Sequence, residues 1–199
     1  MYPTETTKTT REKKSSPVHS GLMDVEYPVM EDFYTIQGEG THTGRAAYFI
    51  RLAGCDVQCW WCDVKDSWDG DKHPKIKTAD LVKRAEESGS DLVVITGGEP
   101  LMHDLGPLTK SLKSRGLRVH IETSGSSPLS GELDWITLSP KRFKKPLDEV
   151  FPSVDELKVV VLTNKDLEWA ELNAKKCPSA TRLLLQPEPL LNAFGDLYA

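Results

Sequence analysis

The sequence has no long hydrophobic run. Hydrophobic residue types make up 38% of its 199 residues and aromatic types 8%. No apolar stretch approaches the roughly 20 residues that a membrane-spanning helix needs. Residues 1–24 are polar and lack the apolar core of a secretory signal. This composition excludes fibrous and membrane-spanning classes and predicts a single globular domain over residues 25–199, preceded by a disordered polar tail at residues 1–24.

Positive charge is also in short supply. Twenty-five Lys and Arg face 30 Asp and Glu, which gives a formal net charge of −5. An acidic chain does not favour a broad phosphate-binding surface, so we expect neither a nucleic-acid nor a membrane partner. The run KRFKK at residues 141–145 is the only obvious basic cluster, and beyond Lys141 it is typical of a solvated loop.

Cysteine is scarce, and its distribution excludes a disulfide scaffold. Three of the four cysteines lie in AGCDVQCWWCD at residues 53–63, as Cys55, Cys59 and Cys62. A bridge between any two of them would leave the third without a partner. The fourth, Cys177, lies far away in a helical pattern and is interpreted as an inert thiol.

Strand-like and helix-like segments alternate along the rest of the chain, which predicts an α/β fold with a mainly parallel sheet covered by helices. Thr78 is the expected N-cap of one helix, which Gly89 ends, and Asn164 is the expected N-cap of another. The predicted strands are residues 32–38, 46–54, 91–98, 117–125, 133–140, 155–162 and 181–187, and the predicted helices are residues 78–89, 105–116 and 164–176.

Polar residues and glycines follow the predicted strands. Because the carboxyl ends of parallel strands meet at one rim, these segments are expected to form one large site. They are Gln37-Gly38, Cys55, Thr96-Gly97-Gly98, Glu122-Thr123-Ser124, Ser139-Pro140-Lys141 and Gln186-Pro187.

The three thiols in one short loop are suited to hold a metal centre. A structural zinc site needs four ligands, and neither His42 nor His73 has a zinc-knuckle spacing. An iron–sulfur cluster usually takes four thiolates, so three would leave one iron free to bind a small molecule. A zinc-binding module therefore stays open as an alternative.

The spacing C-x3-C-x2-C, with an aromatic residue before the third cysteine, resembles the signature of the radical S-adenosylmethionine (SAM) enzymes. The resemblance implies a partial, incomplete TIM-like barrel and a [4Fe–4S] cluster on Cys55, Cys59 and Cys62. The open iron would bind SAM, which an electron from the cluster cleaves to a 5′-deoxyadenosyl radical. TGGEP at residues 96–100 is similar to the glycine-rich stretch that approaches the methionine amino group in this family.

Flanking motifs resemble the 7-carboxy-7-deazaguanine synthases from about residue 28 to residue 188. These motifs are FYTIQGEG, FIRLAGC, TGGEP, ETSG, LSPK, DELKVVV and LLLQPE. The implied reaction converts 6-carboxy-5,6,7,8-tetrahydropterin to 7-carboxy-7-deazaguanine with loss of ammonia, on the route to queuosine. The alternative is another radical SAM enzyme, such as a glycyl-radical activase, which would not require Gln37-Gly38 together with Arg51.

The resemblance also implies binding roles. Arg51 would pair with the substrate carboxylate, although a salt bridge at the rim is its ordinary alternative. Glu39 and Glu122 would either join the site or bond backbone amides. The implied SAM-binding residues are Trp61, Cys62, Asp63, Gly98, Ser139, Pro140 and Lys141, and the implied substrate-binding residues are Ile36, Gln37, Gly38, Arg51, Thr96 and Pro187, with Gln186 at the border.

Two departures from the family pattern matter. Relatives place a threonine after the CD dipeptide, and its hydroxyl helps to bind Mg²⁺, whereas Val64 offers no oxygen; water, Asp66 or Ser67 would have to substitute. Relatives also continue past LQPE with a segment that closes the pocket, whereas this sequence stops at Ala199, so we expect a truncated segment or a differently completed pocket. The resemblance further implies a homodimer, an electron donor such as flavodoxin or ferredoxin, and a cytoplasmic location that protects the cluster from oxygen.

Overall fold

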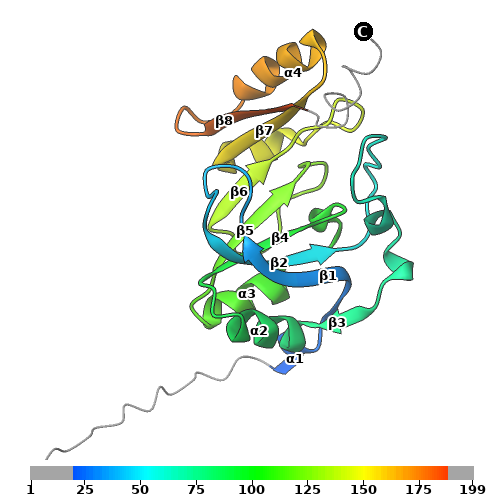
Figure 1. The fold of residues 1–199 in the computed structure, drawn as a ribbon, viewed down its shortest axis with the longest axis vertical. Coiled ribbons are helices and arrows are strands. Elements are labelled where there is room, and N and C mark those ends of the chain that lie inside the picture. Colours follow the sequence, from blue (N-terminus) through cyan, green and yellow to red (C-terminus); the bar gives the residue numbers. More distant parts are fainter. Residues whose placement is uncertain (1–19, 188–199) are drawn as a thin grey trace, which may run out of the picture.

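The computed structural model of the protein describes residues 20–187. The strands form one open sheet in the order β3-β1-β2-β4-β5-β6-β7-β8 (Figure 1). They are β1 (Glu26–Ile36), β2 (Ala46–Leu52), β3 (Lys75–Lys77), β4 (Leu92–Gly97), β5 (Arg118–Thr123), β6 (Trp135–Leu138), β7 (Glu156–Val161) and β8 (Arg182–Pro187). The helices are α1 (Ser20–Met23), α2 (Thr78–Glu87), α3 (Gly106–Ser114) and α4 (Asn164–Ala174), with short 3₁₀ helices at Lys65–Trp68, Gly70–Lys72, Pro100–Met102 and Asp148–Ser153.

The sheet is an incomplete barrel, as predicted. From β2 through β4, β5, β6 and β7 to β8, every neighbouring pair of strands is parallel. Only β1 runs antiparallel, to β2 on one side and to β3 on the other. The strands β3 and β8 form the two edges, so the sheet does not close on itself.

The two faces of the sheet differ because side chains alternate along each strand. On the outer face, Val93 and Ile95 of β4 join a buried cluster with Leu81 of α2 and Leu108 and Leu112 of α3. Further along, β7 packs against α4 in a second buried cluster. The opposite, inner face carries the polar residues of the strands and is described below.

Two helix starts differ from the prediction. The Thr78 hydroxyl donates to the Val25 carbonyl at 2.9 Å, and Lys77 occupies the N-cap position of α2. The helix α4 begins one residue earlier than a cap at Asn164 requires. Its N-cap is Thr163, which forms a capping box with Asp166. Gly89 follows the end of α2 with a φ of +73°, so its role as a stop is confirmed.

The ends of the described chain also differ in part from the prediction. Ser20–Met23, which the sequence reading placed in the polar tail, form α1 and contact α2 and α3. Residues 1–19 of that tail and the C-terminal segment after Pro187 lie outside the described residues. No helix within residues 20–187 combines the length and the apolar character needed to cross a membrane.

Candidate active site

One large cleft of about 780 Å³ lies at the carboxyl ends of the strands. It receives the cysteine loop that follows β2, the glycine turn that follows β4 and the polar segments that follow β5 and β6. The predicted site residues that line it are Gln37, Gly38, Arg51, Cys55, Cys59, Trp61, Cys62, Asp63, Thr96, Gly98, Ser139 and Lys141, together with Val64 and Gln186. The expectation that these segments form one site is therefore met by the geometry.

The cysteine loop leaves β2 through a sharp turn. Gly54 has a φ of +101° and Gln58 a φ of +50°, so the chain turns twice within a few residues. Backbone bonds tie the base of the loop to the 3₁₀ helix after it: Gly54 N–H donates to Ser67 O at 2.7 Å, and Cys55 N–H donates to Trp68 O at 3.1 Å. The loop is thus held by its own continuation.

The three thiols face the same cleft, and burial disfavours a bare thiolate at Cys55 and Cys59. Burial raises the pKa of Cys55. It also raises the pKa of Cys59 to about 11, and the neighbouring Cys62 and Cys55 add to this while Lys141 opposes it. A cationic centre would offset the cost of burying a thiolate, because a coordinated thiol is held deprotonated by the metal.

The donor set fits a multi-iron cluster better than a single zinc ion. Within residues 20–187, no three His, Cys, Asp or Glu side chains are close enough together to enclose one metal ion. A cluster spaces its thiolates farther apart than a single ion does. A zinc site also wants four ligands, and no histidine is among the described residues that line the cleft.

The glycine turn after β4 is packed directly onto the start of the cysteine loop. A Cβ at Gly97 would lie 2.0 Å from Leu52 O, and one at Gly98 would lie 2.3 Å from Gly54 O. Only glycine allows these two backbones to approach so closely. The turn and the cysteine loop therefore form one wall of the cleft.

Glu99 in the same turn holds a second loop in place. This buried carboxylate accepts hydrogen bonds from Thr123 Oγ1, from Ser124 N–H at 2.8 Å and from Leu101 N–H at 3.0 Å. It thereby joins TGGEP to the ETSG segment after β5. The sequence analysis assigns no role to Glu99. A carboxylate inside a buried turn is nevertheless a signal, because it needs hydrogen-bond donors as partners.

Glu122 gathers the predicted substrate-binding residues. Gln37 Nε2 donates to Glu122 Oε1, and Thr96 Oγ1 donates to Glu122 Oε2, both at 3.1 Å. Glu122 thus bonds two side chains from two other segments, rather than the backbone amides that were its alternative. The three residues form a preformed polar patch on the inner face.

A second polar group lies beside this patch. Glu39 pairs with Lys158 and accepts a hydrogen bond from Gln186 Nε2 at 3.0 Å. Burial disfavours the charge on Lys158, but Glu122, Glu39 and Glu156 outweigh it and raise the pKa of the lysine. Burial likewise opposes ionisation of Glu39, yet Lys158 and Gln186 lower its pKa. The pair is charged on both sides.

Lys158 was missed by the sequence reading. Alternation within DELKVVV places Lys158 on the same face of β7 as Glu156, and a lysine on an inward face of a buried strand is an available signal.

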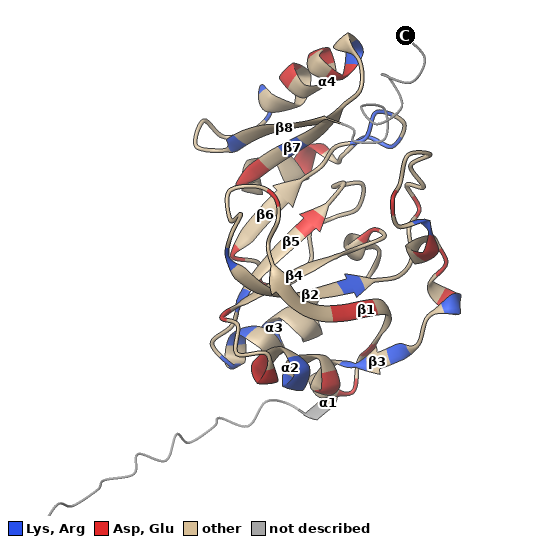
Figure 2. Cartoon of the chain, in the orientation of Figure 1, with Lys and Arg blue, Asp and Glu red and all other residues tan. Residues whose placement is uncertain are grey.

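Arg51 forms the salt bridge that was the alternative to its predicted ligand role, and its side chain also lines the cleft. It lines the cleft, and its Nε donates to Glu31 Oε1 at 2.8 Å. The two residues are register partners on adjacent strands, seen in Figure 2 as the red segment of β1 beside the blue segment of β2. Within the described residues, Nε is the only side-chain atom of Arg51 that makes a hydrogen bond, so the terminal nitrogens are left for another carboxylate.

The segment after β6 lines the cleft near the cysteine loop. Lys141 Nζ donates to Ser139 Oγ at 2.6 Å and to Ser139 O at 2.9 Å. Burial lowers the pKa of Lys141, and nearby Lys158 adds to this. Arg142 and Lys144 pair with Asp166 and Asp56, so this basic run is largely neutralised, as expected for a loop without a phosphate surface.

Three predicted positions do not line the cleft, and a fourth lines it without the expected ligand atom. Ile36, Pro140 and Pro187 are not among its lining residues, and the Pro140 carbonyl accepts a hydrogen bond from Trp169 Nε1 at 3.2 Å. The Val64 position does line the cleft but brings no oxygen. Backbone contacts from Ile36, Pro140 and Pro187 stay predictions.

Comparison with known proteins reveals close relatives. The Radical SAM superfamily model matches residues 49–159. The 7-carboxy-7-deazaguanine synthase of Synechocystis sp. is 52% identical over 169 residues, which cover 85% of this chain and 81% of that relative. The Escherichia coli K12 protein of the same name is 36% identical over 169 residues, covering 72% and 76%. Among solved structures, the crystal structure of QueE from Escherichia coli matches with a TM-score of 0.73 and 37% identity, covering 81% of this chain and 83% of that one.

The superfamily match runs from within β2 to within β7 and includes the cysteine loop, which places the chain in the class of radical SAM enzymes. That class implies a [4Fe–4S] cluster and SAM. The relatives then narrow the class: the chain belongs to the 7-carboxy-7-deazaguanine synthase family.

Proposed function

We propose that the protein converts 6-carboxy-5,6,7,8-tetrahydropterin to 7-carboxy-7-deazaguanine with loss of ammonia. The observation that carries this proposal is the polar patch of Gln37, Thr96 and Glu122, which lies in the same cleft as the three cysteines. A carboxylate and an amide side by side suit the hydrogen-bonding edge of a pterin. A radical enzyme that acts on a protein backbone has no need of this set.

The cofactors fit the opposite side of the cleft. Cys55, Cys59 and Cys62 would hold the [4Fe–4S] cluster, and Gly98 leaves the backbone accessible to SAM. Together, the bound cluster and SAM supply the radical chemistry. Trp61 and Lys141 wall this side and limit access of water.

Arg51 would bind the substrate carboxylate. Its Nε is engaged by Glu31, which fixes the plane of the guanidinium and leaves the terminal nitrogens for a second carboxylate. Lys158 and Glu39 lie deeper along the inner face and would bond the heterocycle.

Magnesium is proposed only as a largely hydrated ion at the substrate carboxylate. Val64 supplies no oxygen, and Asp66 is not among the lining residues of the cleft. Ser67 lines it, although its hydroxyl donates to Val64 O at 2.7 Å. Water and substrate oxygens would therefore provide most ligands, as Mg²⁺ tolerates. We further propose a homodimer, a flavodoxin- or ferredoxin-like electron donor and a cytoplasmic location.

The test is an anaerobic assay of the reconstituted protein with SAM, a reductant and 6-carboxytetrahydropterin, followed by mass spectrometry. We expect one 7-carboxy-7-deazaguanine to form for each 6-carboxytetrahydropterin consumed, with and without added Mg²⁺. Formation of 5′-deoxyadenosine without that product would support the assignment as a radical SAM enzyme and contradict the assignment of the substrate. Iron-free, zinc-loaded protein after anaerobic isolation would overturn both.

A further inference from the structure

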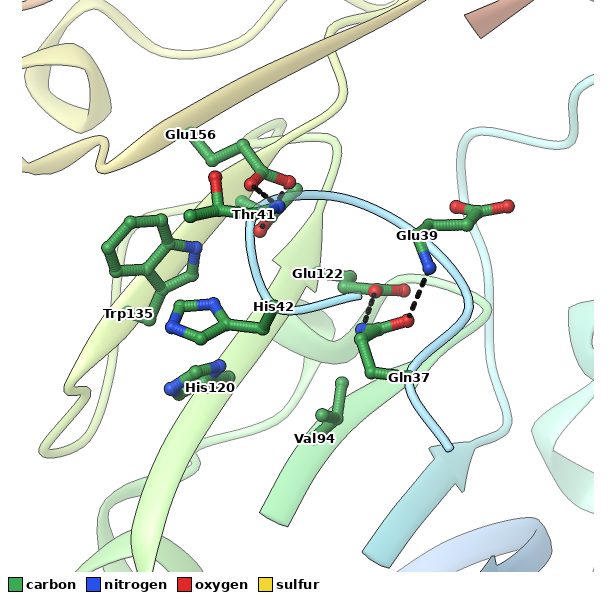
Figure 3. Close-up of a pocket in the computed structure, with 10 residues that line it drawn as sticks. Gln37, Glu39, Thr41, His42, Val94, His120, Glu122, Trp135 and Glu156 are labelled. Atoms are coloured by element: carbon green, nitrogen blue, oxygen red, sulfur yellow. Dashed lines mark hydrogen bonds between the residues drawn. The ribbon is translucent and has the colours of Figure 1, made fainter. Parts of the chain in front are cut away.

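The loop between β1 and β2 passes across the inner face of the sheet. This segment, residues 37–44, is called the floor loop here. Its first part carries Gln37 and Glu39 at the cleft, and its tip reaches Glu156 of β7 and the rings of His120 and Trp135 (Figure 3). In a closed barrel, side chains of the strands fill this interior. In this open sheet the floor loop fills part of it.

The loop is internally closed. Gly44 N–H donates to Gln37 O at 2.8 Å, and Thr43 N–H donates to Gly40 O at 3.2 Å. Gln37 Oε1 accepts from Glu39 N–H at 3.1 Å. Because these bonds join the loop to itself, they shape it but do not place it on the sheet.

The side chains of Gln37 and Glu39 bond Glu122 and Lys158 of the sheet, and Glu156 attaches the backbone at the tip of the loop. Its side chain is 3% exposed, and its Oε2 accepts a hydrogen bond from Thr41 N–H at 2.7 Å. Thr137 Oγ1 lies 3.4 Å from the other oxygen. The carboxylate is also pressed against Gly40, where φ is +74° and a Cβ would lie 2.4 Å from Glu156 Oε1. A carboxylate and a glycine that lie far apart in the sequence are thus fitted to each other.

A ring contact supports the same attachment. The His42 ring lies with its centroid 4.5 Å from that of His120 and 4.5 Å from that of Trp135, edge-on to the latter. This contact is apolar and permits sliding, whereas the Glu156 bond fixes one backbone atom. Of these two contacts at the tip, the hydrogen bond is therefore the one that fixes the tip of the loop.

We infer that Glu156 is a positioning residue: it holds the floor loop so that Gln37 and Glu39 meet the pterin. The inference rests on the proposed function. Glu156 is not among the residues that line the large cleft, so it acts through the loop and not on the substrate. Loss of the anchor is expected to weaken pterin binding while SAM binding and cluster content stay unchanged, because those sites lie on other loops.

A second role of Glu156 must be separated from this one. Its charge helps to hold Lys158 protonated, and a loss of that charge would also disturb the site. Glu156→Gln removes the charge but keeps an oxygen that accepts from Thr41 N–H. Glu156→Leu has similar volume and removes both. The two variants therefore distinguish anchoring from electrostatics.

Neighbouring Asp155 offers a matched control. Its Oδ2 accepts a backbone hydrogen bond from Ile136 N–H at 2.8 Å, so it makes the same kind of contact but to β6 rather than to the floor loop. Gly40→Ala tests the other side of the contact, because the added Cβ meets the carboxylate. The variants for comparison are Glu156→Gln, Glu156→Leu, Gly40→Ala and Asp155→Leu.

The first readout is hydrogen exchange of residues 37–44 in the holoenzyme without substrate. We expect Glu156→Leu and Gly40→Ala to speed exchange in the floor loop by about tenfold or more, and Glu156→Gln and Asp155→Leu to leave it near the wild-type rate. Unchanged exchange in Glu156→Leu would overturn the anchor. This readout does not depend on the identity of the substrate, so it stands even if the pterin assignment fails.

The second readout is steady-state kinetics. Glu156→Leu is expected to raise KM for 6-carboxytetrahydropterin about tenfold or more with a smaller fall in kcat, while KM for SAM changes less than about twofold. Glu156→Gln should restore most of the loss. Equal defects in Glu156→Gln and Glu156→Leu would assign the effect to charge on Lys158 and overturn the positioning role. Wild-type protein that fails to turn over the pterin would overturn the proposed function instead.

Discussion

Arg51 is held by one carboxylate while facing a space suited to another. Its strand β2 is mostly apolar and leads straight to Cys55, so a guanidinium there is costly unless it is paired. Glu31 on the neighbouring strand provides the pairing at 2.8 Å. The salt bridge uses Nε and is therefore compatible with the proposed ligand role, which would use the terminal nitrogens.

Replacing Arg51 separates substrate binding from cluster assembly. Arg51→Ala is expected to lower kcat/KM for the pterin by about 100-fold, because a bidentate charge-assisted pair is lost. Iron and sulfide content should match wild type. Glu31→Gln, which leaves the guanidinium in place, is expected to cost less than about tenfold. Loss of the cluster in Arg51→Ala would contradict the assignment, and iron analysis with steady-state kinetics decides it.

Single residues were predictable where their chemistry is local. The spacing of the cysteines indicates a metal centre, and the position of Gly97 and Gly98 after an apolar strand indicates a turn at the site. The Glu39–Lys158–Gln186 group could not be foreseen in this way, because its members are separated by 119 and 147 residues along the chain. Its existence depends on the floor loop reaching β7, which no local pattern encodes.

At the scale of elements, the contact between the glycine turn and the cysteine loop is the closest approach in the site. Gly98 lies so near Gly54 O and Cys55 that no Cβ fits between them. The turn after β4 and the loop after β2 are therefore fixed to each other, and Glu99 extends the connection to the segment after β5.

A methyl group at Gly98 tests this contact. Gly98→Ala is expected to push the cysteine loop outward, to lower iron content after reconstitution by more than half and to destabilise the protein by about 2 kcal/mol. Gly21→Ala is the matched control, since nothing lies within 4 Å of its added Cβ. Full iron content in Gly98→Ala would show that the two segments are not coupled; iron analysis and urea denaturation provide the measurements.

The start of α4 supplies a stability test that is independent of activity. Thr163→Ala removes the hydroxyl of the capping box and is expected to lower the free energy of unfolding by about 1 kcal/mol. Asn164→Ala, which replaces the first helical residue, should change it by less than about 0.5 kcal/mol. Urea denaturation measures both, and a larger effect at Asn164 would restore the cap predicted from the sequence.

Elements were predicted better than their ends. Strands and helices alternate as the sequence indicated, because the apolar runs are long and bounded by glycine or proline. Both caps are displaced by one residue because a cap is defined by backbone conformation, and the extended residue at each start is the one before the predicted cap. The early part of β1 was missed because Pro28 argues against a strand interior, and this strand lies next to the edge strand β3. A three-residue strand such as β3 is too short to produce a recognisable alternation of apolar and polar residues.

For the whole molecule, openness of the sheet decides how the interior is filled. Apolar residues cover the outer face, and the inner face carries charge, histidine and tryptophan beneath the floor loop. His120 is 4% exposed, and its Nε2 has no hydrogen-bond partner among the described residues. Burial, together with His42, Arg118 and Arg45, lowers the pKa of His120 to about 4.

Acid stability should follow from this histidine. An unfolded chain protonates His120 near pH 6.5, whereas the native protein resists protonation until about pH 4. Native stability is therefore complete above about pH 7 and declines between 6.5 and 4, by roughly 3 kcal/mol at most. Urea denaturation of cluster-free protein across this range measures the decline. His120→Gln should flatten the slope, whatever its stability at pH 7.5; an unchanged slope would contradict the prediction.

The floor loop also makes the depth of the cleft independent of the packing of the barrel core, whereas in a closed barrel the two are coupled. The depth of the cleft depends on a surface connection between two antiparallel strands, and not on the layered side chains of a barrel core. Insertions or deletions in such a connection are tolerated far more readily than core changes. The size of heterocycle accepted can therefore change during evolution, or in an engineered library of residues 38–43, while the loops that hold the cluster and SAM are inherited intact.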